Sequence, residues 1–238
     1  MRVVIDRRRL ARRARWSHAA SLGGLLAILA SAALTLFRPD LSTPGAMLLV
    51  GGFAVATVGI AQANRWVKRP RPEDILDGAL KGLDDRHRLY HYLDGLPPHL
   101  LLTPSGVVVL ETRAGEGVYE YRNGRWSQRM TLGKALRFFV EEPLGDPVQE
   151  AETRAALLAR ALSRRLRGAT QVPTRAVVVF THPATIVRAD GPRVPVVQPK
   201  NLRRHAAATG RPLSAETYAF VRTLLDSKVR GTDASGVA

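Results

Sequence analysis

The chain has 238 residues, no cysteine, and 36 basic against 20 acidic side chains, which gives a formal net charge of +16. The lack of cysteine excludes disulfides, thiolate metal sites and a cysteine nucleophile. The positive charge favours anionic partners such as nucleic acid or phospholipid. It is concentrated near the N-terminus, where residues 1–16 contain seven arginines and one aspartate, and four further basic residues lie within residues 65–71.

Two apolar runs, residues 19–37 and 46–63, contain no charged side chain. Each approaches the ~20 residues that a helix needs to cross ~30 Å of hydrocarbon. The link between them contains two prolines and a glycine, which predicts a tight return, so residues 19–64 are expected to form a transmembrane helical hairpin. Small residues in both runs favour close packing of the two helices in lipid, namely Gly23, Gly24, Ser31, Gly51, Gly52 and Gly59.

Two other interpretations of these runs compete with the hairpin. The basic start and the small residues at 31–33 also suit a cleavable secretory signal, and a buried hairpin of a soluble protein has similar composition. A signal leaves the second run unexplained, and a soluble core hairpin rarely carries arginine clusters at both outer ends. Residues 1–18 are therefore expected to be a basic N-terminus and residues 65–72 a basic, proline-rich linker.

The arginine clusters also predict an orientation. Both clusters flank the hairpin on one side, whereas the connecting turn has one arginine and one aspartate. The positive-inside rule therefore predicts a multi-pass protein of the cell membrane with both termini in the cytoplasm.

After the linker, the sequence pattern is that of an α/β domain. Residues 73–93 have helical apolar spacing, although glycines at 78 and 82 interrupt it. Three apolar runs at residues 99–103, 106–112 and 118–121 predict an antiparallel meander, with Asn123-Gly124 as a hairpin turn.

A second helix and further strands follow. Asp146-Pro147 predicts the start of a long helix, because aspartate is a good N-cap and proline suits the first helical position. Residues 175–181 form a strand that is expected to lie parallel to an earlier one, because a helix precedes it. A short strand at 194–197 and helices at 200–208 and 214–227 complete the predicted α/β order.

Four motifs together resemble the nuclease-related domain (NERD) family over about residues 75–200. They are the run from His99 to Arg113, Gly124-Arg-Trp126, Asp146-Pro147, and Val177-Val-Val-Phe-Thr-His-Pro183. The resemblance implies a restriction-endonuclease-like fold for residues 73–200, with a mixed sheet flanked by helices, followed by a helical tail at 201–238. In active members it implies metal-dependent cleavage of phosphodiesters.

The resemblance also implies a degenerate catalytic centre. Such a nuclease needs carboxylates that converge on a cation such as Mg²⁺, and a lysine near the attacking water. Glu111 occupies the glutamate position of the family, Arg113 stands in place of the lysine, and Glu150 stands in place of a glutamine. Pro98 replaces the aspartate that precedes the histidine, and it has no side-chain ligand atom.

A surviving metal site would have to combine Glu111 with Asp94, as a displaced carboxylate, and with Asp84 or Asp85. The competing interpretation makes Asp94-Gly95 a turn and Asp84 a solvated charge on a helix. Mg²⁺ is the cofactor expected for an active nuclease, and no cofactor is expected otherwise.

Other candidates have structural alternatives. His87 and His91 are spaced for Zn²⁺ on the predicted helix, with Asp84 one turn earlier, but such histidines are more often partly buried helix residues. His182 follows a strand and suits a loop role. Aromatic residues that suit base stacking suit core packing equally well, namely Tyr90, Tyr92, Tyr119, Tyr121 and Trp126.

The sequence thus predicts a membrane-anchored cytoplasmic protein that binds nucleic acid or a protein partner without catalysis. The alternative is a divalent-metal-dependent nuclease. No P-loop, dinucleotide fingerprint, zincin helix or nucleophile elbow is present, which argues against nucleotide hydrolysis, acyl transfer and a small-molecule cofactor.

Overall fold

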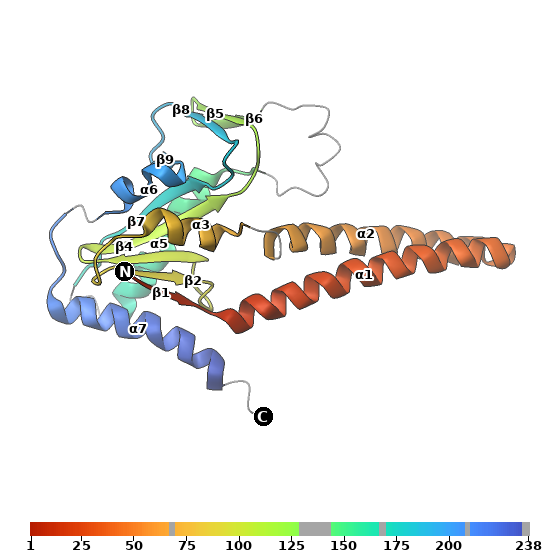
Figure 1. The fold of residues 1–238 in the computed structure, drawn as a ribbon, viewed down its shortest axis with the longest axis horizontal. Coiled ribbons are helices and arrows are strands. Elements are labelled where there is room, and N and C mark those ends of the chain that lie inside the picture. The colour runs from red at the N-terminus through yellow and green to blue at the C-terminus, as the bar shows by residue number, and fades with distance from the viewer. Residues whose placement is uncertain (67–69, 129–143, 167–169, 208–209, 235–238) are drawn as a thin grey trace. The chain divides into compact units, whose positions relative to one another are not determined.

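The computed structural model describes residues 1–66, 70–128, 144–166, 170–207 and 210–234. The chain divides into two compact units (Figure 1). An α/β unit combines Met1–Asp6 with Pro72–Arg129 and Leu144–Ala238, and a helical unit contains Arg7–Arg71.

The α/β unit is built on a sheet with the strand order β1-β2-β3-β4-β7-β9. Strands β2, β3 and β4 are antiparallel neighbours, whereas β4 and β7 are parallel, with Val109 opposite Ala176. The predicted mixed α/β sheet and the parallel placement of the strand after the long helix are therefore confirmed. The strands are Arg2–Ile5 (β1), Arg88–His91 (β2), His99–Thr103 (β3), Gly106–Arg113 (β4), Thr174–Phe180 (β7) and Val196–Val197 (β9).

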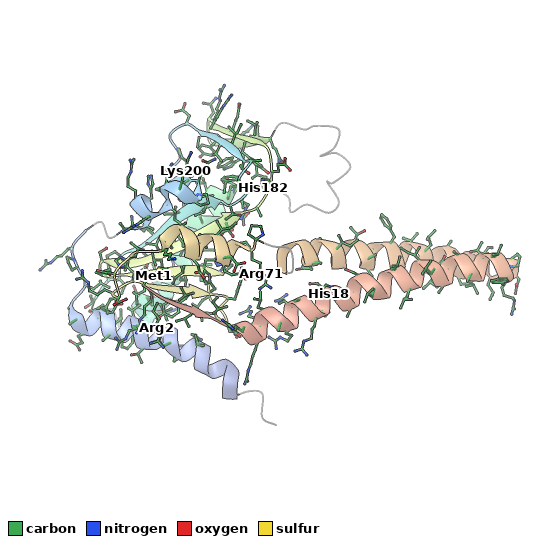
Figure 2. All side chains as sticks on the ribbon, in the orientation of Figure 1. Met1, Arg2, His18, Arg71, His182 and Lys200 are labelled. Carbon is green, nitrogen blue, oxygen red and sulfur yellow. The ribbon has the colours of Figure 1, made fainter. Side chains whose placement is uncertain are left out.

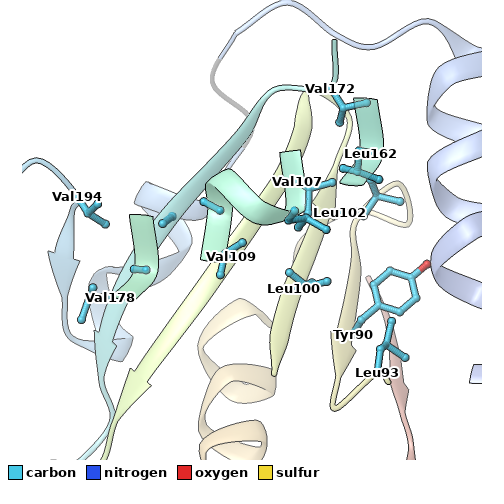
Figure 3. Packing of buried hydrophobic residues seen from close by; sticks show 14 of the residues in the cluster. Tyr90, Leu93, Leu100, Leu102, Val107, Val109, Leu162, Val172, Val178 and Val194 are labelled. Carbon is cyan, nitrogen blue, oxygen red and sulfur yellow. The ribbon is translucent and has the colours of Figure 1, made fainter. Parts of the chain in front are cut away.

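Helices cover both faces of this sheet. Helices α3 (Pro72–Leu80) and α6 (Pro199–Ala206) contribute to one apolar core together with Val108 and Leu110 of β4. Helices α5 (Pro147–Arg165) and α7 (Ala215–Ala234) contribute to the other core together with Val107 and Val109 (Figure 3). Successive side chains of a strand point to opposite faces, so the odd-numbered residues of β4 face α5.

Helix α5 begins where the sequence predicts it. The Asp146 carboxylate accepts hydrogen bonds from the backbone amides of Val148 and Gln149, at 3.1 and 3.0 Å, and Pro147 takes the first helical position. This N-cap satisfies two amides that have no partner within the helix. The buried stripe of α5 consists of Ala151, Ala155, Leu158 and Leu162.

The predicted single meander is wrong in one respect, because its later strands leave the main sheet. Strands β5 (Val118–Arg122) and β6 (Arg125–Gln128) form a second sheet with β8 (Ile186–Ala189), which pairs parallel to β5. The predicted hairpin turn is present, and Asn123 and Gly124 both have positive φ angles, of 51° and 75°. Strand β8 was not predicted, because its half-exposed residues lack a long apolar run.

The predicted helix over residues 73–93 is wrong beyond Leu80, where α3 ends. Gly82 has a φ of +89°, which glycine adopts without strain, and the chain turns there. The chain then enters β2, which lies between β1 and β3 and buries Leu89 and His91. The helical spacing proposed for a zinc pair is therefore also wrong, because His91 belongs to a strand.

The N-terminus supplies an unpredicted edge strand. Residues 2–5 pair parallel to β2, with Val3 opposite Leu89. The terminal ammonium group of Met1 donates to the Leu83 carbonyl at 2.9 Å and pairs with Asp85 at 3.2 Å (Figure 2). An apolar run of only three residues between Arg2 and Asp6 gave no clear strand signal in the sequence.

The helical unit is a hairpin of α1 (Arg7–Phe37) and α2 (Ser42–Trp66), joined by a short helix at Pro39–Leu41. Both long helices are apolar and long enough to cross a membrane. Close packing is confirmed at three of the predicted small residues. A Cβ atom at Gly24 would lie 2.3 Å from the Ala56 nitrogen, one at Gly59 would lie 2.4 Å from the Ser21 nitrogen, and Gly52 is similarly crowded.

We expect Gly24→Leu to destabilise this hairpin, because the new side chain would collide with the α2 backbone. Overpacking of this kind costs roughly 1–3 kcal/mol. Gly23→Leu is the matched control, since a Cβ atom at Gly23 meets nothing within 4 Å. Thermal unfolding of the full chain in detergent, followed by circular dichroism, should show a lower midpoint for Gly24→Leu alone. Equal midpoints for the two variants would contradict the packing described here.

Candidate functional site

The candidate site lies at the end of β4, where Glu111 and Arg113 point to the face that α5 covers. Because residues i and i+2 of a strand share a face, both side chains continue the line of Val107 and Val109. The apolar residues before them are fully buried, so the charged pair is also buried, with side-chain exposures of 4% for Glu111 and 8% for Arg113. A charge removed from water in this way needs compensation by partners.

Both carboxylate oxygens of Glu111 are bound by guanidinium groups. Its Oε1 accepts from Nη1 of Arg113 at 2.5 Å, and its Oε2 accepts from Nη1 of Arg154 on α5. Each oxygen therefore has one of its acceptor sites occupied by a guanidinium N–H, and the negative charge of the carboxylate is already compensated. A cation at this carboxylate would meet two neighbouring positive charges.

Arg113 links the strand to the start of α5. Its Nε donates to the Leu144 carbonyl at 3.2 Å, and its Nη2 pairs with Glu150 at 2.9 Å. Burial alone would lower the pKa of this guanidinium, but the charges and hydrogen bonds of Glu111 and Glu150 outweigh burial and raise the pKa. Arg113 therefore stays charged under all ordinary conditions.

Glu150 completes a neutral cluster of two glutamates and two arginines. Its carboxylate lies 3.7 Å from Nη2 of Arg154, one helical turn away. The outer side of the cluster opens into a hollow of 340 Å³, lined by Asp146, Gln149, Glu150, Thr153 and Arg154. The three predicted catalytic positions Glu111, Arg113 and Glu150 are thus brought together by the fold.

Sequence reasoning missed Arg154, which makes the cluster neutral. A signal for it exists, because Arg154 is four residues after Glu150, and oppositely charged side chains at i and i+4 face each other on a helix. Arg154 contacts Glu111 from the helix that covers the strand, and residue spacing along the chain does not predict this contact.

The carboxylates predicted for a metal lie in other contacts. Asp84 pairs with His87 and with Arg86, and these hydrogen bonds lower its pKa to about 2. Asp85 pairs with the N-terminal ammonium group, and Asp94 lies exposed in the turn between β2 and β3. Within the described part of the chain, no three histidine or acidic side chains converge as a metal site would require.

A second polar cluster, also missed, lies on the opposite face of the sheet under α3. His91 contacts Asp77 at 3.0 Å and His99 at 2.8 Å, and the Tyr92 hydroxyl donates to Glu73 at 2.7 Å. His91, His99 and Glu73 are each at most 2% exposed. The sequence pattern did not reveal this cluster, because it predicted that His91 and Tyr92 lie on one helix with residues 73–80. In the structure they lie at the end of β2, opposite α3.

The remaining candidates have structural roles. His182 lies in the loop after β7, where its Nδ1 accepts from the Ala184 amide (Figure 2). Tyr119 and Trp126 pack against Phe180 at ring-centroid distances of 4.9 and 5.7 Å. Burial of Tyr90 and Tyr92 likewise favours core packing over base stacking.

The fold and the charged cluster define a mixed α/β domain whose polar centre joins β4 to α5. Residues 73–181 match the family described as the nuclease-related domain. This match confirms the resemblance seen in the sequence. No match to a curated protein or to a solved structure is found for the chain.

We expect Glu111→Ala to destabilise the α/β unit by roughly 3–5 kcal/mol, because it leaves the buried Arg113 without its main counter-charge. Glu152→Ala on α5 is the control. Its pair with Arg193 is long, at 3.7 Å, and exposed, so the expected loss is about 0–1 kcal/mol. Denaturant unfolding of the full chain in detergent measures both, and similar losses would refute the structural role given to Glu111.

Proposed function

We propose that the protein is a membrane-anchored nuclease-related domain that binds an anionic partner, with nucleic acid as the best candidate, and does not hydrolyse it. The observation that supports this most directly is the double ion pair of Glu111. A metal-dependent nuclease needs that carboxylate to bind a cation, and here both of its oxygens already bind arginine.

Two further substitutions support the loss of hydrolysis. Continuing the β3–β4 register two residues beyond the Leu100–Val109 pair brings Pro98 level with Glu111, and proline offers no ligand there. Arg113 neutralises phosphate charge but does not give up a proton, and it cannot replace a lysine beside an attacking water.

The binding role rests on unpaired basic residues at the far end of α5. Arg160 and Arg164 are exposed, lie one helical turn apart, and form no ion pair with any described residue. They line a hollow of 540 Å³ together with Ala159, Ser163, Gln171 and Val172. Two guanidinium groups beside a hydroxyl and an amide suit a phosphate-bearing ligand. A protein partner would need an acidic surface to fit the same residues.

The competing function is a nuclease in which Asp94 supplies the missing carboxylate. The full chain in lipid nanodiscs, with DNA or RNA and Mg²⁺ or Mn²⁺, distinguishes the two. We expect binding without metal-dependent cleavage. Cleavage that EDTA stops and that Glu111→Gln abolishes would overturn the proposal, and the glutamine variant is preferred because it keeps the shape of the site.

The same assay tests the binding surface. We plot the logarithm of the association constant for nucleic acid against the logarithm of the salt concentration. Arg160→Gln with Arg164→Gln should make the slope of this plot shallower by about 1.4–1.8, since each lost phosphate contact contributes about 0.7–0.9. Arg12→Gln with Arg15→Gln removes equal charge from α1 and should leave the slope unchanged.

The proposal also includes the topology of the membrane anchor, in which both ends of the helical hairpin lie on the same side of the membrane. This is supported by the strands on either side of the hairpin: β1 precedes α1 and β2 follows α2, and the two pair in one sheet. By the positive-inside rule, the arginine clusters favour the cytoplasm as their compartment.

Single cysteines test this topology cleanly, because the chain has none of its own. We expect a cysteine at Ser227 to be shielded from an impermeant maleimide in intact cells, and a cysteine at Ser42 to react. Both should react after the cells are opened. Labelling of Ser227→Cys in intact cells would contradict a cytoplasmic domain.

A further inference from the structure

The charge of the helical hairpin is confined to one end. Between Arg7 and Arg71 the sequence contains a single acidic residue, Asp40, which pairs with Arg38 in the connecting turn at 3.0 Å. The first nine residues of α1 include six arginines, at positions 7, 8, 9, 12, 13 and 15. The hairpin therefore has a neutral turn end and a strongly basic open end.

Three of these arginines, Arg8, Arg12 and Arg15, lie on the same stripe of α1 as its exposed leucines, and Arg12 and Arg15 are the two nearest to the leucines. Residues that recur at steps of three and four share one face of a helix. Along α1 this series runs through Arg12, Arg15, Ala19, Leu22, Leu26 and Leu29, and every member is exposed. The opposite stripe, with Ser17, Gly24 and Ser31, is buried against α2.

The helix also sets the depth of these arginines. At a rise of about 1.5 Å per residue, Arg15 lies about 6 Å and Arg12 about 10 Å beyond Ala19, where the apolar run begins. The head-group region is about 5–8 Å thick on each side of the hydrocarbon. Arg7, about 18 Å from Ala19, lies more than a Debye length (~8 Å) outside the head-group region. Trp16, 54% exposed, and His18 lie between Arg15 and Ala19 in the sequence, and His18 is labelled on α1 in Figure 2.

We infer that Arg12 and Arg15 form a binding site for the head group of an anionic phospholipid whose acyl chains lie along Leu22 and Leu26. This inference rests on the membrane anchoring proposed above. The site has the two parts that a lipid requires. One is a pair of cations, with Arg15 at head-group depth and Arg12 within a Debye length of it, and the other is a continuous apolar stripe below them. The exposed indole of Trp16 is of the kind enriched at the membrane interface.

A lipid fits this surface better than a nucleic acid does. A nucleic acid would use the arginines but leave the stripe from Leu22 to Leu29 without a role. Arg15 is also held at the membrane surface by the span itself, where the local concentration of anionic head groups exceeds that of any soluble polyanion.

The experiment uses the full chain in liposomes of phosphatidylcholine with 20% phosphatidylglycerol. In one preparation the phosphatidylcholine carries brominated acyl chains, which quench tryptophan fluorescence. In the other preparation the phosphatidylglycerol carries them. We expect stronger quenching by brominated phosphatidylglycerol than by brominated phosphatidylcholine, and loss of this preference at high salt. Arg12→Gln with Arg15→Gln should reduce the relative association constant of the anionic lipid about 25-fold, at roughly fivefold per arginine. Arg125→Gln with Arg211→Gln, both exposed in the α/β unit, is the control of equal charge and should keep the preference.

The outcomes separate this inference from the proposed function. Extraction of the wild-type chain by alkaline carbonate would refute the membrane anchor and this site with it. Resistance to carbonate together with equal quenching by the two lipids would refute the lipid site alone. Inorganic phosphate at 10-fold excess over the lipid should not abolish the preference, because it lacks the acyl chains. An oligonucleotide that removes the preference, and that binds the Arg12/Arg15 variant weakly, would show that these arginines bind nucleic acid instead.

Discussion

The Glu111 carboxylate, held between two guanidinium groups inside the domain, is the interaction on which the arrangement of the site depends. Arg113 comes from the same strand and Arg154 from the helix that covers it, so the carboxylate ties β4 to α5. A buried carboxylate without counter-charges would cost several kcal/mol. The apolar stripe of α5 packs this helix onto the sheet, and the ion pairs fix its position along the strand.

The substitutions at the family positions form one consistent set. A lysine at position 113 would offer a single ammonium group, whereas the planar fork of arginine reaches Glu111, Glu150 and the Leu144 carbonyl together. Glutamate at position 150 supplies the charge that this fork requires, and Arg154 balances the second carboxylate. Once these four side chains are in place, the cluster is satisfied without a cation. In this structure the three predicted catalytic positions, Glu111, Arg113 and Glu150, act as a link between β4 and the helix that covers it.

Much of the fold was predictable because its signals are local. The apolar runs of the hairpin, the Asp146 cap and the Asn123-Gly124 turn each depend on neighbouring residues, and all three appear as expected. The failures arise where distant residues decide. Residues 88–91 became a strand because β1 and β3 lie on either side of them, and β1 itself is too short to show a pattern. Glu111, Arg113 and Glu150 were found through the family motif, whereas Arg154 and the His91–His99 pair depend on how helices pack on the sheet.

Insertion of the hairpin between β1 and α3 connects the packing of the helices to the stability of the sheet. Strand β1 can pair with β2 only if the chain returns to the sheet after the 65 residues of Arg7–Arg71. Closing a flexible loop of that length would cost entropy that a four-residue strand cannot easily offset. An antiparallel hairpin that packs tightly at Gly24 and Gly59 brings its own two ends together and so removes most of that cost. The edge of β2 is then covered by β1, and as a four-residue strand β1 offers only a short edge for pairing with other chains.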